Sequence, residues 1–385
     1  MTARGKLAEL EALRGIAALV VLLHHTMLGF TPQLHGMTYP DQAITLFGTP
    51  AFALVNGSAA VIVFFVLSGY VLSLNVLRSG SARLAASSAL KRWPRLAGPV
   101  ILTNLMAGLV MAGPGFANRE AAAMVPSVWL GWFYTWPSAG WLEIPHSLWE
   151  GATTFFTGQS FYNSSLWTMV YEFAGSFLVL ASALAVAKLP RGRWACLAVI
   201  GLGTLWLSPY LAPFIVGVGL ALRDRTPHAD WRGAKIALAL VLIVLLGGYH
   251  ENIMSGRPEG LYSGLGPLTA MDPLRLRVIL HTLMACLALL LFRRATFLRT
   301  AMSGRVGRTL GFLSFGIYLC QVLVICSVSS LTYLALEGQG LLQIGATFAV
   351  TGAGTLALAV PVALFDHWWV RQVGRTLSRG PWRGA

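Results

Sequence analysis

The sequence alternates long apolar stretches with short segments that carry most of its charged residues. A helix needs about 20 apolar residues to cross a hydrocarbon core of roughly 30 Å. By that measure the pattern predicts ten membrane-spanning helices, at about 14–32, 52–77, 96–113, 165–187, 194–208, 210–222, 234–249, 278–292, 308–334 and 341–365. The fifth and sixth segments are short, and one bent helix is the alternative interpretation for them.

Basic residues are distributed unevenly over the loops between these segments. If the N-terminus is cytoplasmic, 24 of the 28 Lys and Arg residues fall on the cytoplasmic side, which is the usual orientation signal in membrane proteins. Because 188–193 and 223–235 are both basic, merging the fifth and sixth helices would place one of these loops outside. The sequence therefore predicts an all-α, polytopic transmembrane bundle of about ten helices, with both termini cytoplasmic. The last residues, 366–385, are expected to form a basic cytoplasmic tail.

Composition agrees with this interpretation and excludes others. Apolar residues make up 56% of the 385 and charged residues only 11%, whereas soluble domains carry about 25% charged residues. A net charge of +14 would suggest nucleic acid as the partner of a soluble protein. Here the basic cytoplasmic loops account for the charge, so that no nucleic-acid partner is expected. The four cysteines lack the spacing of a disulfide framework or a metal site.

The longest segment between predicted helices, at about 114–164, is rich in aromatic residues. It is expected on the outer face. One interpretation is an aromatic belt at the membrane interface with a re-entrant piece. The other is a platform on which sugar rings of an extracytoplasmic substrate stack.

Ionisable side chains inside a span are costly and by default mark a functional site. His24 and His25 lie in the first predicted helix, and Glu172 lies inside the fourth. Arg14 and His25 are eleven residues apart, which on a helix gives an offset of roughly 20° and a rise of about 16 Å. This spacing predicts a cation at the cytoplasmic interface below an imidazole in the outer half of the bilayer. A histidine satisfied by a neighbouring helix is the alternative.

Glu172 is expected at about the same depth as His25. A carboxylate that accepts a hydrogen bond from one imidazole nitrogen would raise the basicity of the other, as a general base requires. A glutamate satisfied by hydroxyl or backbone groups at a helix kink is the alternative. Arg92, Trp93 and Arg95 precede the third predicted helix on the cytoplasmic side, where they would hold phosphates and a stacked adenine or serve only as a positive-inside anchor.

Five motifs follow one another along the chain, and together they resemble the acyltransferase family 3, integral membrane O-acyltransferases of ten spans. They are Arg14 with ten residues before His25, Phe64–Tyr70, Arg92–Arg95, Leu166–Glu172 and Ser314–Leu319. The resemblance extends from residue 8 to about 370, so that the whole chain, 1–385, is expected to form a single domain of this family. Two positions differ from the family: Gln321 stands where many relatives have histidine, and Asp366 stands near a common glutamate.

The resemblance implies transfer of an acyl group, most often acetyl, from cytoplasmic acyl-CoA to a hydroxyl of an acceptor reached from the membrane or the outer face. Acyl-CoA would be a co-substrate, without a tightly bound cofactor. The implied roles are catalysis by His25, Arg14 and Glu172. Acyl-CoA would be bound by Arg92, Arg95 and Trp93. The implied substrate-binding residues are Ser68, Tyr70, Trp167, Thr168 and Tyr171.

Several alternatives stay open at this point. The hydroxyl attacks the thioester directly, with His25 as the base, or the reaction passes through an acyl-histidine. The acceptor is a surface polysaccharide, a lipid-linked glycan, peptidoglycan or a secreted small molecule, and the membrane is expected to be a bacterial inner membrane. A different class of function is a proton-coupled transporter or flippase that uses Glu172 and His25 as a proton relay, although no pair of broken helices recurs in inverted halves.

Overall fold

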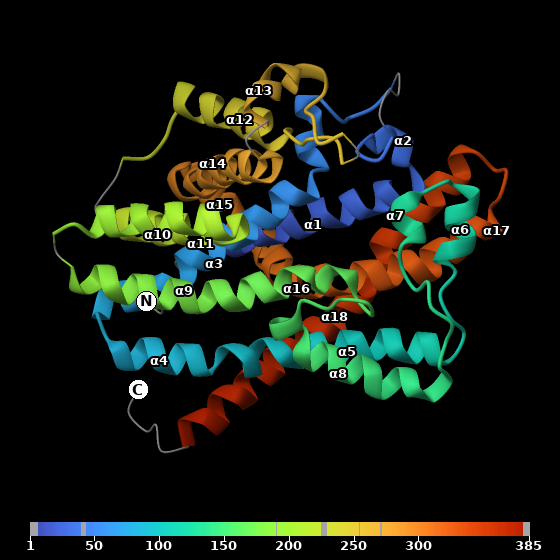
Figure 1. Cartoon of the computed structure of the whole chain (residues 1–385), viewed down its shortest axis with the longest axis horizontal. Coiled ribbons are helices and arrows are strands. Elements are labelled where there is room, and N and C mark those ends of the chain that lie inside the picture. The colour runs from blue at the N-terminus through green and yellow to red at the C-terminus, as the bar shows by residue number, and fades with distance from the viewer. Residues whose placement is uncertain are drawn as a thin grey trace.

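The computed structural model describes residues 7–39, 44–189, 191–224, 229–253, 255–269 and 272–379. In these ranges the chain is helical, and its β-structure is one isolated bridge between Glu251 and Pro258. The long helices lie side by side in a bundle (Figure 1). The predicted all-α class is confirmed.

The α-helices in chain order are α1 (Ala8–Phe30), α2 (Pro32–His35), α3 (Gly57–Ser79), α4 (Ala82–Leu90), α5 (Arg92–Ala112), α6 (Asn118–Met124), α7 (Val128–Gly131), α8 (Glu143–Thr157), α9 (Met169–Lys188), α10 (Arg193–Leu207), α11 (Ala212–Arg223), α12 (Ala234–Gly247), α13 (Gly266–Thr269), α14 (Pro273–Arg294), α15 (Thr296–Met302), α16 (Arg305–Val324), α17 (Ser330–Ala335) and α18 (Leu341–Arg379). The 3-10 helices are η2 (Pro50–Leu54), η3 (Gly140–Leu142), η4 (Ser164–Thr168), η5 (Pro209–Leu211) and η6 (Gly260–Leu265), and η7 (Ile325–Ser329) is a π-helix between α16 and α17.

Apolar helices account for all ten segments predicted from hydropathy. Seven are long and apolar enough to cross a membrane: Ala8–Phe30, Gly57–Ser79, Ala82–Ala112, Ser164–Lys188, Pro273–Arg294, Arg305–Ala335 and Leu341–Thr376. Three are shorter: Arg193–Leu207, Pro209–Arg223 and Ala234–Gly247. Each predicted segment therefore corresponds to a helical segment of the structure. The break between α10 and α11 at Ser208 separates the fifth from the sixth.

Small residues bring the central helices close together. A Cβ added to Gly15 of α1 would lie 2.6 Å from the backbone carbon of Leu310 in α16, and one added to Gly311 would lie 2.6 Å from Cβ of Glu11. Both distances are too short for any other residue, so that the two helix backbones cross at these glycines. Small residues at helix crossings are the usual way for membrane helices to pack tightly. This contact fixes α1, which carries Arg14 and His25, against α16.

The outer segment contains a helix that the hydropathy pattern does not indicate. α8 packs along α5, with Gly108 against Ser147 and Gly151 against Ile101. Its side of this interface is partly polar, because Asn104 of α5 donates a hydrogen bond of 3.3 Å to Glu150. Buried carboxylates lower the mean hydropathy of α8, and for this reason the helix was expected only as part of an irregular outer segment.

The ends of the bundle differ in character. α1 begins and α18 ends toward the same end, on the left in Figure 1, whereas α2, α6 and α7 lie at the opposite end. α18 continues to Arg379, so that 366–379 of the expected tail are helical, and 380–385 lie outside the described residues. The cytoplasmic position of both termini stays a prediction.

Candidate functional site

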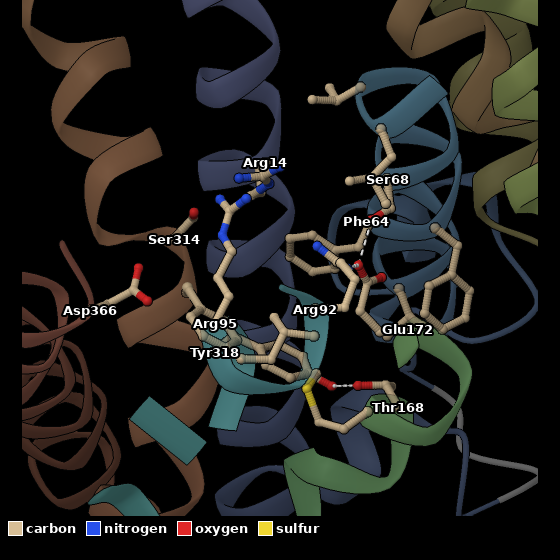
Figure 2. Close-up of a pocket in the computed structure, with 17 residues that line it drawn as sticks. Arg14, Phe64, Ser68, Arg92, Arg95, Thr168, Glu172, Ser314, Tyr318 and Asp366 are labelled. Carbon is tan, nitrogen blue, oxygen red and sulfur yellow. Dashed lines mark hydrogen bonds and ion pairs between the residues drawn. The ribbon is translucent and has the colours of Figure 1, made fainter. Parts of the chain in front are cut away.

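A cavity of about 200 Å³ lies between α1, α3, α5, α9, α16 and α18. Its floor and walls combine apolar side chains with an unusual number of ionisable ones for the interior of an apolar bundle. The charged and hydroxyl-bearing residues that line it are Arg14, Ser68, Arg92, Arg95, Thr168, Glu172, Ser314, Tyr318 and Asp366 (Figure 2). These residues come from the five predicted motifs and from Asp366 within α18.

Arg92 and Glu172 form a buried ion pair across the cavity wall. The guanidinium nitrogen Nη2 lies 2.8 Å from Oε1 of Glu172, and the two side chains are 8% and 16% exposed. Arg92 also donates from Nε to the hydroxyl of Ser176 at 2.8 Å, while Ser68 donates to Oε1 of Glu172 at 2.5 Å. Two hydroxyl groups thus complete the hydrogen bonding of the pair, as a buried charge pair requires.

This pairing corrects the expected position of Arg92. The arginine does not precede the third helix, because α4 and α5 form one helical segment, Ala82–Ala112, and Arg92 is only 6% exposed in its interior. The segment before Arg92 is rich in Ala, Ser and Leu. These residues continue the helix although their hydropathy is modest.

Arg14 and Arg95 are the remaining cations of the cavity. Arg95 is exposed, and Arg14 forms a half-exposed ion pair of 3.1 Å with Glu11 on its own helix. Both arginines lie close enough to Asp366 to interact with its carboxylate, and Figure 2 shows them on the same side of the cavity as this residue. Three arginines and two carboxylates give the lining a net positive charge, which favours an anionic ligand.

Tyr318 and Thr168 line the cavity together and join α16 to the start of α9. The Tyr318 hydroxyl lies 2.7 Å from that of Thr168 and donates to the carbonyl oxygen of Ser165 at 2.7 Å (Figure 2). One turn along α16, the Gln321 amide donates to the carbonyl oxygen of Tyr318 at 3.3 Å. Polar side chains of α16 therefore continue one turn beyond the cavity lining, from Tyr318 to Gln321.

His25 does not line this cavity, but it lies beside Gln321. Its ring stacks on that of Trp129 in α7, with 4.9 Å between centroids and 13° between planes, and the ring of His24 is 5.1 Å away. Nδ1 of His25 and Oε1 of Gln321 are both buried and have no hydrogen-bond partner. A buried imidazole nitrogen beside a buried amide oxygen, both without partners, can take up a hydroxyl group by hydrogen bonding.

The predicted contact between Glu172 and His25 is wrong. The carboxylate is bound by Arg92 and Ser68, and Nδ1 of His25 has no partner. The predicted depths of Glu172 and His25 place both groups in the interior of the bundle. Depth along a helix does not determine which way a side chain points. Arg92, unexpectedly buried, takes the carboxylate instead.

Four other residues predicted for the site lie outside the cavity. The Tyr70 hydroxyl donates to Asp224 at 2.6 Å, and the Trp93 indole donates to the carbonyl oxygen of Ala152 at 3.1 Å. Trp167 and Tyr171 pack with Tyr210 in an aromatic cluster. Around the cavity the structure therefore groups six predicted residues, Arg14, Arg92, Arg95, Ser68, Thr168 and Glu172. The indole of Trp93, which was predicted to stack on the adenine, lies outside the cavity.

The structure also adds residues that the sequence did not single out. Trp129 was one of many aromatic residues in the outer segment. His35 of α2 lies with Nε2 at 2.9 Å from Nδ1 of His24, which is also 2.8 Å from the carbonyl oxygen of Val55. His35 follows His24 by eleven residues, the same spacing as from Arg14 to His25. This repeated spacing is the feature of the sequence that could have indicated His35. Within the described ranges, no three His, Cys, Asp or Glu residues gather as metal ligands would.

Comparison with known proteins identifies the family. A family model described as an acyltransferase domain, acyltransferase 3, matches residues 7–366. A curated relative, O-acetyltransferase PaAT-1 of Phomopsis amygdali, is 25% identical over 357 aligned residues, which cover 80% of this chain and 70% of the relative. No solved structure matches the chain significantly.

The matched range includes Arg14, His25 and every residue of the cavity. The long apolar helices agree with a protein embedded in a membrane. The predicted resemblance is confirmed. The chain is an integral membrane acyltransferase and belongs to the acyltransferase 3 family.

Proposed function

We propose that this protein transfers an acyl group, most simply acetyl, from cytoplasmic acyl-CoA to a hydroxyl group of a glycan at the outer face of a bacterial inner membrane. The observation that carries the proposal is the positively lined cavity, with Gln321 one turn of α16 beyond its lining residue Tyr318 and with His25 beside Gln321. A thioester donor with an anionic end fits such a cavity. The name of the relative, an O-acetyltransferase, supports transfer of acetyl to oxygen.

The donor enters from the end of the bundle where α1 begins. Arg14 and Arg95 are the cations at the cavity that are not buried in an ion pair, and guanidinium groups bind phosphate oxygens well. The uncharged pantetheine arm then lies against apolar residues such as Phe64 and Phe315. About 16 Å of helix separates Arg14 from His25, and the arm spans this distance.

His25 acts as the general base in the reaction. It takes the proton of the acceptor hydroxyl, whose oxygen attacks the thioester carbonyl. The carbon–sulfur bond then breaks, and the sulfur leaves as CoA thiol after taking the proton back from the imidazolium. Trp129 and Gln321 hold the ring in place. The hydroxyl group of Thr168, which turns away from Tyr318, donates to the developing oxyanion.

The alternative of a proton-coupled transporter loses its main support. A relay through Glu172 and His25 requires the two groups to exchange protons, yet Glu172 is held by Arg92 and Ser68. The acyltransferase family assignment favours the enzyme. We therefore retain O-acyl transfer as the proposed function.

Mass spectra of envelope glycans test the proposal in cells. Cells that express the protein should contain glycans heavier by one acyl group, and cells that express His25→Ala at an equal level in the membrane should not. Gln343→Ala, near the start of α18 and outside the cavity lining, is the control that should keep the modification. The proposal is contradicted if the His25→Ala cells carry as much acylated glycan as the wild type.

A further inference from the structure

A second cavity of about 980 Å³ opens near the end of the bundle where α1 begins. It lies between the start of α1, the second half of α3, and the ends of α11 and α14, with α15 on its far side. Val71 of α3 lines this cavity and the first one. The two cavities are therefore adjacent, with Val71 in the lining of both.

The acidic residues of the second cavity are already paired. Arg293 lies 2.9 Å from Glu9 and 2.7 Å from Asp224, and Arg294 also pairs with Asp224. Burial alone would raise the pKa of the Asp224 carboxyl, but hydrogen bonds from Tyr70 and Arg293 and the arginine charges hold it below its usual value. Asp224 thus stays ionised, and because Asp224 and Glu9 are both bound to arginine, they do not neutralise other cations of the cavity.

Two arginines in the lining remain accessible to a ligand. Arg78 is exposed in the last turn of α3. Arg299 of α15 donates from Nη1 to the carbonyl oxygen of Arg293 at 3.1 Å and forms a long contact of 3.5 Å with Asp230. The side chains of Arg299 and Asp230 are both more than a third exposed, so that water and salt weaken their ion pair. The hydroxyl groups of Thr300 and Ser303 are also in the lining. This combination of guanidinium and hydroxyl donors fits phosphate oxygens.

Apart from Arg14 and Arg95, the described lining of the first cavity offers no accessible cation and no indole for the nucleotide end of the donor. Arg92 is held by Glu172 and Ser176, and Trp93, the expected partner of the adenine, is bonded to Ala152 outside the cavity. From Ser68 in the first cavity to Arg78 in the second is ten residues of α3, a rise of about 15 Å. An extended donor would therefore leave the first cavity past Val71 and reach the second.

We propose that the second cavity binds the phosphorylated nucleotide end of acyl-CoA, with Arg78 and Arg299 on the phosphate of its ribose, while the diphosphate passes Val71 to Arg14 and Arg95 and the pantetheine arm lies in the first cavity. This inference rests on acyl-CoA as the donor of the proposed function. It assigns the two ends of one substrate to two cavities that share a wall.

Adenosine 3′,5′-bisphosphate, the nucleotide end of CoA alone, is the probe for this site. Its binding is measured on the full-length protein in nanodiscs of zwitterionic lipid, and its inhibition of acetyl-CoA turnover is measured on the same samples. The wild type should bind it in competition with acetyl-CoA. Arg78→Gln and Arg299→Gln should each weaken binding about tenfold, the loss of one charge-assisted contact, with a parallel rise in KM for acetyl-CoA. Arg305→Gln, exposed at the start of α16 and in neither cavity, is the matched control.

The outcomes separate this inference from the proposed function. If the wild type turns over acetyl-CoA but the bisphosphate neither binds nor competes, the inference is wrong and the function stands. If the bisphosphate binds in an Arg78-dependent way but acetyl-CoA is never consumed, the site stands and the function fails. A lipid headgroup as the true ligand would show instead as Arg78-dependent binding of anionic lipid that the bisphosphate does not displace, which overturns the inference.

Discussion

The ion pair between Arg92 and Glu172 allows a quantitative test of the structure. Both side chains are at most 16% exposed and their charged atoms are 2.8 Å apart, so that removing one partner leaves a buried charge without compensation. Such a loss costs about 3–5 kcal/mol, whereas replacing both partners by apolar residues of similar volume is often close to neutral. We therefore expect Arg92→Met and Glu172→Leu each to destabilise the protein by about 3–5 kcal/mol.

The double variant should cost far less than the sum of the two single variants. A coupling energy of at least about 3 kcal/mol is expected, measured by chemical unfolding in mixed micelles followed by tryptophan fluorescence. The ion pair of Arg275 with Asp272, 30% and 28% exposed, is the matched control and should give at most about 1 kcal/mol. Single-variant costs that simply add within about 0.5 kcal/mol would refute the buried pairing.

The remaining predictions concern three other parts of the molecule. Trp129→Leu should lower kcat about tenfold with little change in KM for acyl-CoA, because the His25 ring loses its stacking partner; equal kcat in Trp129→Leu and the exposed control Trp132→Leu would contradict this. Burial and the charge of Arg277 hold the pKa of His250 well below 6.5. As the pH falls through about 6.5, His250 therefore takes up a proton in the unfolded chain but not in the native protein. Thermal stability should therefore fall on acidification, less steeply in His250→Gln, and an unchanged slope would contradict the argument. Gly15→Val should prevent close crossing of α1 and α16 and greatly lower the yield of folded protein, whereas Gly203→Ala, with open space around it, should fold normally.

Much of the helical architecture was predictable because hydrophobicity dominates in a membrane protein. Runs of apolar residues correspond to helices, and basic loops separated α10 from α11 where length alone was ambiguous. α8 was missed because it is partly polar and buries Glu150 against Asn104. Hydropathy averages over a segment and does not detect carboxylates that are satisfied by a neighbouring helix.

The sequence predicted which residues line the candidate site better than it predicted which residues they contact. Helical spacing placed Arg14, and the motifs placed Ser68, Thr168 and Glu172, around what proves to be one cavity. The partner of Glu172 was not predictable, because it depends on the burial of Arg92, which follows from how α4 continues into α5. The stacking of His25 on Trp129 depends on the path of an irregular outer segment, and no local pattern specifies that path.

Consumption of acyl-CoA by the purified protein in nanodiscs tests the central claim most directly. The thiol released from acetyl-CoA is measured with and without envelope glycan as acceptor, for the wild type and for His25→Ala. We expect acceptor-dependent thiol release by the wild type, and release reduced to the background rate in the variant although its helical content and its binding of adenosine 3′,5′-bisphosphate are unchanged. Release at an equal rate by both proteins, or none by either in the presence of acylatable glycan, would contradict the account.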